Sequence, residues 1–282
     1  MGFFDRLSDR VDTIGNRVGD FFDEVLLPED VARTLRRAAD DIERGAYDEA
    51  KRLLGQAVHE RPEFHRTHHL MGLCFFYEGD PGEALDYFNR AIELREEAIS
   101  HFYAGLAAER LGETHEAKIH LQRVFEIKED PPFAFDVRFA LGRVFMAQGR
   151  PDKAVREFRK ARKAWPEHAE ATVALAEALL ERGEIDSARN LLESENAERV
   201  GIEAWVLRGR VELRAGRPKE ARDFYERALD EAPEHLDALV GAARANIEVE
   251  DHLAANEHLL GALGIADDDR LAEIELLLGR VN

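Results

Sequence analysis

The chain has 282 residues, 45% of them hydrophobic, and its 39 basic and 58 acidic side chains give a formal net charge of −19. The hydrophobic content is sufficient for a folded core, and the length alone suggests about two globular domains. The charge argues against a general nucleic-acid binder, which needs Lys and Arg opposite the phosphates, and it disfavours docking on an anionic membrane surface.

The first residues, Met1 to Arg6, lack the basic and apolar regions of a secretory signal, and no apolar run is long enough to span a membrane. The single cysteine, Cys74, excludes an internal disulfide, which fits a reducing compartment. The basic residues are 32 Arg and 7 Lys, a bias that suggests a GC-rich bacterial source. We therefore expect a soluble, cytoplasmic, bacterial protein.

Residues 3–26 predict an amphipathic helix that Pro28 ends. Its apolar stripe, at alternating steps of three and four, consists of Phe4, Leu7, Val11, Ile14, Val18, Phe21 and Val25. Gly15 and Gly19 weaken this helix by about 1 kcal/mol each relative to alanine, so it needs a surface to lie on. Three surfaces are open alternatives: the first repeat, where the helix would be a cap; a partner or the chain's own groove; and a membrane.

Internal repetition dominates the rest of the chain. Turn glycines recur at Gly45, Gly79, Gly112, Gly149, Gly183 and Gly216, and each is followed five residues later by an alanine. These alanines, with one more at the end of the series, are Ala50, Ala84, Ala117, Ala154, Ala188, Ala221 and Ala255. Apolar residues three and four apart flank each turn on both sides, which predicts a pair of helices per repeat. The glycine suits a left-handed helix C-cap, and the small alanine allows the two helices to pack closely.

One repeat contains Trp205, Gly209, Gly216, Ala221, Tyr225, Ala228 and Pro233 at fixed offsets. Another contains Leu141, Gly142, Phe145, Gly149, Ala154, Phe158, Ala161 and Pro166, and a third contains Met71, Gly72, Phe75, Gly79, Ala84, Phe88 and Ala91. The pattern resembles the 34-residue tetratricopeptide (TPR) repeat. The resemblance implies an all-α fold, a right-handed α-solenoid of stacked helix-turn-helix repeats with capping helices at both ends.

On this resemblance, residues 1–30 form the N-terminal amphipathic helix and residues 270–282 a C-terminal capping helix. Seven repeats lie between them, at residues 31–64, 65–97, 98–134, 135–168, 169–201, 202–235 and 236–269. Asp269 is the expected N-cap of the last helix, whose apolar face consists of Leu271, Ile274, Leu277 and Leu278.

Four repeats depart from the TPR pattern. The first has Arg37 and Asp41 at positions that are usually apolar. The third carries extra residues at 128–133, where two prolines block a helix and predict a bend. The fifth should have a short second helix, from Asp186 to about residue 194, and the last has Glu250 in place of the turn glycine.

In TPR proteins the first helices line a concave groove, and the resemblance assigns specific residues to it. The partner-binding residues expected here are Leu35, His69, Leu73, Phe76, Tyr77, Phe102, Leu106, Phe139 and Arg143. Toward the C-terminus the same positions present Val173, Glu177, Val206, Arg210, Val240 and Arg244. Aromatic anchors in such a groove suit an amphipathic helix or an extended peptide. The alternative is that Leu73, Phe76 and Phe102 pack between neighbouring helices.

The resemblance does not extend to the carboxylate clamp of some TPR domains. The Lys and Asn of that clamp are replaced by Leu35, His69 and Phe102 at one position and by apolar residues at the other. We therefore do not expect chaperone tails as ligands.

Histidines cluster in the second and third repeats, and His65, His68 and His101 are the candidates for a metal site. The sequence lacks H-E-x-x-H, paired C-x-x-C, P-loop, dinucleotide and nucleophile-elbow motifs. An enzyme with a metal site is therefore a weaker rival, and we expect no catalytic residue, no metal and no cofactor.

The sequence favours a non-enzymatic adaptor or scaffold that binds a protein or peptide partner in its concave groove. We expect no nucleic acid and no small-molecule substrate. The alternative function is that of a peripheral membrane assembly factor attached through residues 3–26.

Overall fold

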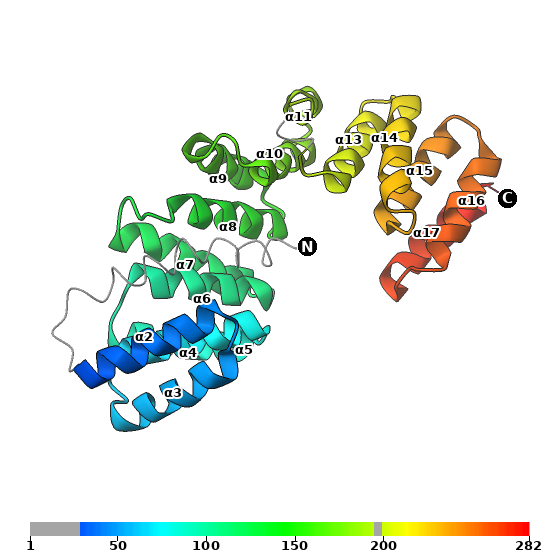
Figure 1. Cartoon of the computed structure of the whole chain (residues 1–282). Coiled ribbons are helices and arrows are strands. Elements are labelled where there is room, and N and C mark those ends of the chain that lie inside the picture. The colour runs from blue at the N-terminus through cyan, green and yellow to red at the C-terminus, as the bar shows by residue number, and fades with distance from the viewer. Residues whose placement is uncertain (1–28, 195–198, 282) are drawn as a thin grey trace. The chain divides into compact units, whose positions relative to one another are not determined.

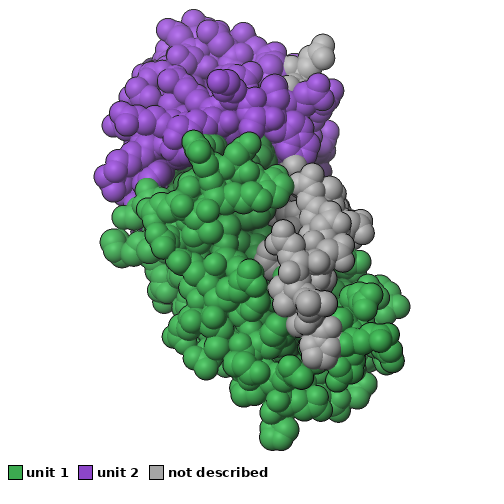
Figure 2. Space-filling view, turned by 90° about the vertical axis from the view of Figure 1, so that its left-hand side faces the viewer, with its two compact units in different colours: residues 1–144 green, residues 145–282 purple. Residues whose placement is uncertain are grey.

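The computed structural model of the chain describes residues 29–194 and 199–281, which form α-helices and turns with no β-strand among them. The chain divides into two compact units, residues 1–144 (unit 1) and residues 145–282 (unit 2), coloured green and purple in Figure 2. No helix of the described ranges is long and apolar enough to cross a membrane. The helix expected at residues 3–26 lies outside the described residues, so its three alternatives stay predictions.

Unit 1 is a stack of helices in which each one packs on the next (Figure 1). In order they are α2 (Glu29–Glu43), α3 (Tyr47–Glu60), α4 (His65–Glu78), α5 (Pro81–Leu94), α6 (Ala98–Arg110) and α7 (Thr114–Ile127). Helix α8 (Ala134–Ala147) begins in unit 1 and ends in unit 2. Eleven of the fourteen residues of α4 are buried, so this helix has no broad solvent-facing side. The proline-containing stretch at 128–133 is not helical, as expected.

Unit 2 continues the same pattern of helix pairs (Figure 1). Its helices are α9 (Pro151–Ala164), α10 (Ala169–Glu181), α11 (Ile185–Leu192), α13 (Ile202–Arg214), α14 (Pro218–Glu231), α15 (Leu236–Glu248), α16 (His252–Leu263) and α17 (Asp268–Val281). Helix α11 has eight residues where α9 and α14 have fourteen, which confirms the expected short helix. Each unit has the all-α solenoid fold of stacked helix-turn-helix repeats.

The turns and the small residues behave as their spacing predicts. All six turn glycines have positive φ, between 64° and 89°, so they adopt the left-handed conformation that ends the first helix of each pair. All seven alanines of the repeat series are completely buried. The expected N-cap Asp269 is wrong by two residues: α17 starts at Asp268, and the Asp267 carboxylate accepts a hydrogen bond from the Arg270 backbone N–H at 3.1 Å.

Further glycines lie within the first helices and allow bulky side chains of neighbouring helices to approach. A Cβ placed at Gly72 would be 2.7 Å from the Phe88 ring, and one at Gly209 would be 2.6 Å from Cζ of Tyr225. Real Cβ atoms do not make contacts this short. These glycines are therefore required by packing between helices and not by backbone conformation.

Glu250 is the one residue other than glycine with positive φ, 61°, in the described part of the chain. It occupies the place of the turn glycine in the last helix pair, where a side chain carries a conformational cost. We expect Glu250→Gly to stabilise unit 2 by about 1 kcal/mol after the greater entropy of glycine in the unfolded chain is subtracted.

The matched control is Glu257→Gly, an exposed change inside α16 that should destabilise unit 2 by about 1 kcal/mol. Both tryptophans, Trp165 and Trp205, belong to unit 2, so urea unfolding followed by Trp fluorescence measures both variants. A loss of stability in Glu250→Gly would show that the left-handed residue carries no strain.

Candidate partner-binding surfaces

The expected partner-binding residues of unit 1 lie largely inside the helical stack. Leu35, Phe76, Phe102 and Leu106 have no exposed surface, and Leu73, Phe139 and His69 are also buried. Only Tyr77 and Arg143 of the expected set are partly exposed. The structure brings these residues into one unit, but it does not present most of them as an open apolar surface.

The surroundings of Phe76 explain its burial. The Arg110 guanidinium lies 3.8 Å from the centre of the Phe76 ring and covers it, and Arg110 also donates a hydrogen bond to the Phe76 carbonyl. Tyr77, Phe88 and Tyr103 meet the same ring edge-on at 5.5–6.5 Å. These contacts support the alternative that Phe76 packs between helices, because a side chain enclosed in this way cannot also anchor a partner without rearrangement.

Arg143 is half-buried and paired. Its Nε donates a hydrogen bond to Glu109 Oε1 at 2.7 Å, which joins α8 to α6. Burial raises the pKa of the Glu109 carboxyl, and the nearby positive charge of Arg143 opposes this rise. This pair therefore links consecutive helix pairs of unit 1.

An open pocket of about 570 Å³ lies in unit 2, and we call it the arginine pocket. It is lined by Val206, Arg210, Leu213, Arg214, Tyr225, Asp237, Val240, Gly241, Arg244, Arg270 and Glu273. These residues come from α13, α14, α15 and α17. The pocket thus combines an apolar floor with four guanidiniums and two carboxylates.

The floor of the arginine pocket depends on close helix packing. The Tyr225 ring lies between Gly209 of α13 and Gly241 of α15, and a Cβ added at Gly241 would be only 2.3 Å from Cζ of the ring. Burial raises the pKa of Tyr225, while the charges of Arg210 and Arg244 act in the opposite direction. The phenol therefore lies within electrostatic range of both guanidiniums.

The arginines of the pocket pair with acids of neighbouring helices. Arg210 donates to Glu177 at 2.9 Å and to Glu181 at 3.1 Å on α10. Arg244 donates to Glu273 at 2.6 Å on α17. A third pair joins Arg270 of α17 to Asp237 of α15 at 2.7 Å. The side chains in these pairs are between 27% and 60% exposed, so the pairs contribute little to stability.

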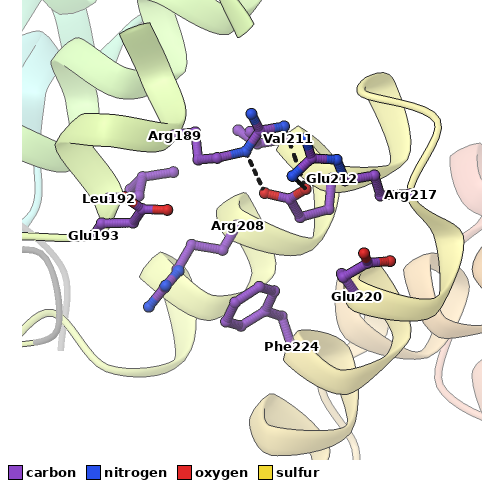
Figure 3. Close-up of a pocket in the computed structure, with 9 residues that line it drawn as sticks. All are labelled: Arg189, Leu192, Glu193, Arg208, Val211, Glu212, Arg217, Glu220 and Phe224. Carbon is purple, nitrogen blue, oxygen red and sulfur yellow. Dashed lines mark hydrogen bonds and ion pairs between the residues drawn. The ribbon is translucent and has the colours of Figure 1, made fainter. Parts of the chain in front are cut away.

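A smaller hollow of about 180 Å³ lies near the short helix α11. Figure 3 draws the residues that line it. Arg189 donates from Nε and Nη2 to the two carboxylate oxygens of Glu212, at 2.7 and 3.3 Å. Beside this pair, the Arg208 guanidinium lies 4.3 Å from the centre of the Phe224 ring. Glu212 is buried and its carboxylate is engaged by Arg189, so the polar groups at this end of the hollow fasten α11 to α13.

The three histidines of the weaker metal-site alternative have separate partners. His68 Nε2 lies 2.8 Å from the Pro62 carbonyl, and His65 Nε2 lies 3.2 Å from Glu97 Oε1. His101 pairs with His120 of α7, with 2.9 Å between their Nδ1 atoms. No cluster of three or more His, Cys, Asp or Glu side chains that could hold a metal occurs in the described ranges. His65, His68 and His101, the candidates of the weaker metal-enzyme alternative, therefore do not form a group of metal ligands in the described ranges.

Comparison with known families identifies the repeats. Tetratricopeptide repeat profiles match three segments, residues 65–98, 139–199 and 202–245. The chain is a tetratricopeptide repeat protein. No curated protein matches its sequence. Proteins of the TPR family generally mediate protein–protein interactions and are typically non-enzymatic scaffolds.

Solved TPR structures share the fold. A chain of the APC/C hetero-tetramer Cut9–Hcn1 aligns with a TM-score of 0.69 at 15% identity, over 97% of this chain and 52% of that one. This chain thus spans about half the length of that relative. A TPR protein from Parabacteroides merdae aligns with a TM-score of 0.68 at 15% identity, over 90% of this chain and 99% of that one. YrrB, described as a TPR protein with an unusual peptide-binding site, aligns at 0.55 and 19% identity, over 66% and 95% of the two chains.

The TPR positions explain part of the arginine pocket. Val206, Arg210, Val240 and Arg244 were expected in the C-terminal part of the groove, and the structure gathers them at one pocket. Arg270 and Glu273 were missed because they come from the capping helix, which lies outside the repeat pattern. The repeat pattern identifies Tyr225 only as one of its aromatic residues. The glycines Gly209 and Gly241, which lie against its ring on two first helices, could have indicated its place in the pocket.

Proposed function

We propose that the chain is a non-enzymatic adaptor that binds a segment of a partner protein on the surface that contains the arginine pocket. The observation that carries this proposal is the pocket itself, about 570 Å³ in volume, which is lined by buried apolar side chains and by four arginines. Peptide-binding sites commonly combine apolar contact area with a few polar groups that fix orientation. The single cysteine and the Arg-rich basic composition support a bacterial cytoplasm as the setting.

Only two of the expected groove residues remain candidates for direct contact with a partner. Tyr77 and Arg143 are partly exposed and can contribute to a second contact area on unit 1. The buried members, such as Phe76 and Phe102, act by holding the helices that carry these two. The adaptor mechanism is reversible docking, with no chemical step.

A blocking experiment tests the proposed surface independently of its charge. Arg214 lines the pocket with an exposed side chain, so a bulky maleimide on Arg214→Cys would fill the entrance. The native Cys74 is completely buried and its thiol pKa is raised to about 12, so it should not react. The matched control is Arg156→Cys with the same label, at an exposed position on α9.

Peptides selected from a random display library on the wild-type chain serve as ligands, and fluorescence anisotropy measures their affinity. We expect labelled Arg214→Cys to bind at least tenfold more weakly, about 1.4 kcal/mol, and labelled Arg156→Cys to bind as the wild type does. Equal loss in both labelled variants, or no selectable peptide at all, would count against the adaptor surface.

A further inference from the structure

The solvent-facing side of α16 is apolar. Leu253 is 75% exposed and Leu260 is 55% exposed, and residues seven positions apart lie on the same side of a helix. Leu263, 38% exposed, follows one turn after Leu260. The opposite side of α16 is buried in the core of unit 2, so these three leucines are not needed to hold the helix in place. Adjacent exposed apolar side chains on a folded protein mark an interaction site.

The other repeats show that the repeat framework does not require leucine at these positions. Leu253 lies two residues before the buried alanine of its repeat, and Leu260 lies five residues after it. At the first of these positions the other six repeats have Asp48, Gly82, His115, Asp152, Asp186 and Lys219. At the second they have Gly55, Asn89, Gln122, Arg159, Glu193 and Glu226. The two leucines therefore replace polar residues or glycine, and the fold itself gives no reason for the replacement.

Acidic residues flank these leucines without any basic residue nearby in the sequence. Residues 245–269 contain seven acids and no Lys or Arg. The seven are Glu248, Glu250, Asp251, Glu257, Asp267, Asp268 and Asp269. Glu257 is exposed on α16 itself, between Leu253 and Leu260. Among the described residues only Glu248 of the seven makes an ion pair, with Arg280 at 3.6 Å. The apolar side of α16 is thus surrounded by negative charge that the chain leaves largely uncompensated.

This charge distinguishes between the possible occupants of the surface. A second copy of the chain would bring the same seven acids against it, and residues 1–30 carry eight acids and three arginines, a net charge of −5. Both are repelled, as is an anionic membrane surface. A basic segment is attracted, and an apolar stripe along one helix is matched by the apolar face of an amphipathic helix. The combination favours a helix that is both amphipathic and basic.

We propose that the solvent-facing side of α16 docks a basic amphipathic helix of a partner protein. Apolar residues of that helix cover Leu253, Leu260 and Leu263, and its Lys or Arg side chains lie opposite Glu257 and the acids at the two ends of α16. None of the residues that line the arginine pocket belongs to α16, so this surface is separate from the pocket and goes beyond the proposed function.

Three combinatorial libraries of amphipathic peptides on beads test the proposal with the fluorescently labelled full chain. Each peptide has about 14 residues, enough to match the length of α16. The first library has Leu, Ile, Met or Phe along one face and Lys or Arg beside it. The second keeps that apolar face and has Asp or Glu beside it. The third has the basic residues but Ser or Gln in place of the apolar ones. We expect the first library to bind at least tenfold more strongly than either of the others. Absence of binding by the first library, or equal binding by the third, would overturn the proposal.

Variants then locate the site with the best peptide of the first library. The double variant Leu253→Gln, Leu260→Gln should bind at least tenfold more weakly, because both anchors are lost. Glu257→Gln should weaken binding severalfold and reduce its dependence on salt. The matched control is Ile119→Gln, the same kind of change at a 51% exposed position on α7 of unit 1, which should bind as the wild type does. Circular dichroism verifies that each variant is folded. Unchanged affinity in the double variant would overturn the site.

The remaining outcomes identify another occupant or another site. A dimer of the full chain in analytical ultracentrifugation that the double variant dissociates would assign the surface to a second copy and overturn the proposal. Preference for the second library would overturn the charge argument. Maleimide-labelled Arg214→Cys, in which the arginine pocket is blocked, should retain full affinity for the best peptide. Loss of binding in that labelled variant would place the peptide in the pocket instead.

The test does not depend on the adaptor surface of the arginine pocket. Loss of peptide binding there would leave the α16 surface unaffected, and failure of all three libraries would leave the peptides selected for the pocket unaffected. The two proposals therefore fail separately.

Discussion

Replacing Gly241 with alanine is expected to destabilise unit 2 by about 3 kcal/mol, because the new Cβ would overlap the Tyr225 ring and overpack the core. The nearest ring atoms would be 2.3 Å from this Cβ, far inside van der Waals contact. Tyr225 is 1% exposed and rests on Gly209 on its other side, so the ring cannot move away without displacing α13. Urea unfolding followed by the fluorescence of Trp165 and Trp205 measures the loss.

The chain provides a control at Gly279 of α17, where an added Cβ would meet no atom within 4 Å. Gly279→Ala should stabilise unit 2 by as much as about 1 kcal/mol, because alanine is the better helix former. The same glycine-to-alanine change is thus expected to destabilise unit 2 at one helical position and to stabilise it at another. Similar effects in both variants would refute packing as the reason for Gly241.

A double-mutant cycle isolates the contact between ring and backbone. In a Tyr225→Leu background the smaller side chain leaves room for the Cβ, so Gly241→Ala should cost at least about 1 kcal/mol less than in the wild type. Because Tyr225 also lines the arginine pocket, peptide binding by Gly241→Ala reports whether the ring position matters for recognition. An additive cycle would mean that the Tyr225 ring is not what Gly241 accommodates.

The repeat spacing correctly predicts the helix pairs and their turns, because these depend on residues within a single repeat. A glycine at each turn ends a helix in the left-handed region, and the alanine five residues later is buried where two helices meet. Both requirements are satisfied within one helix pair, so they recur with the period of the repeat. The short α11 follows in the same way from Glu195 at a position that elsewhere holds a small residue.

The exposure of the expected groove residues depends on neighbours that the repeat pattern does not describe. Phe76 is covered by Arg110, a residue 34 positions later whose side chain turns back over the ring. The repeat pattern assigns Phe76 to the groove but cannot reveal that a side chain of the next repeat encloses it. The arginine pocket was only half predictable for a related reason, because Arg270 and Glu273 belong to the capping helix α17.

Acidification is expected to lower the stability of unit 1. We expect His69 to contribute most of this loss. His69 is buried among the rings of Phe88 and Tyr103, and its Nδ1 lies 3.0 Å from the Ser100 hydroxyl oxygen. Burial lowers the pKa of His69 to about 4, from an ordinary value of 6.5, whereas the negative charge of Glu97 opposes this shift. Burial also lowers the pKa of His101 and of His120, so these two act in the same direction.

The direction of the pH effect on stability follows from the protons that the folded and unfolded states bind. Between pH 6.5 and pH 4 the unfolded chain protonates this histidine while folded unit 1 keeps it neutral, so stability must fall as the pH falls through that window. Between pH 7 and pH 4.5 the contribution of His69 should decrease by about 2 kcal/mol. His69→Gln keeps a hydrogen-bonding group opposite Ser100 but cannot titrate. The stability of His69→Gln relative to the wild type should therefore rise by about 2 kcal/mol as the pH falls from 7 to 4.5.

Urea unfolding followed by circular dichroism at pH 7 and pH 4.5 makes the comparison, and carboxylates that titrate in both proteins cancel in the difference. Trp fluorescence supplies an internal control, because both tryptophans lie in unit 2 and His69 lies in unit 1. The matched variant is His59→Gln, an exposed change on α3 that should follow the wild-type profile. A constant difference between His69→Gln and the wild type at the two pH values would show that His69 takes up its proton equally in both states, so that its burial does not oppose the charge.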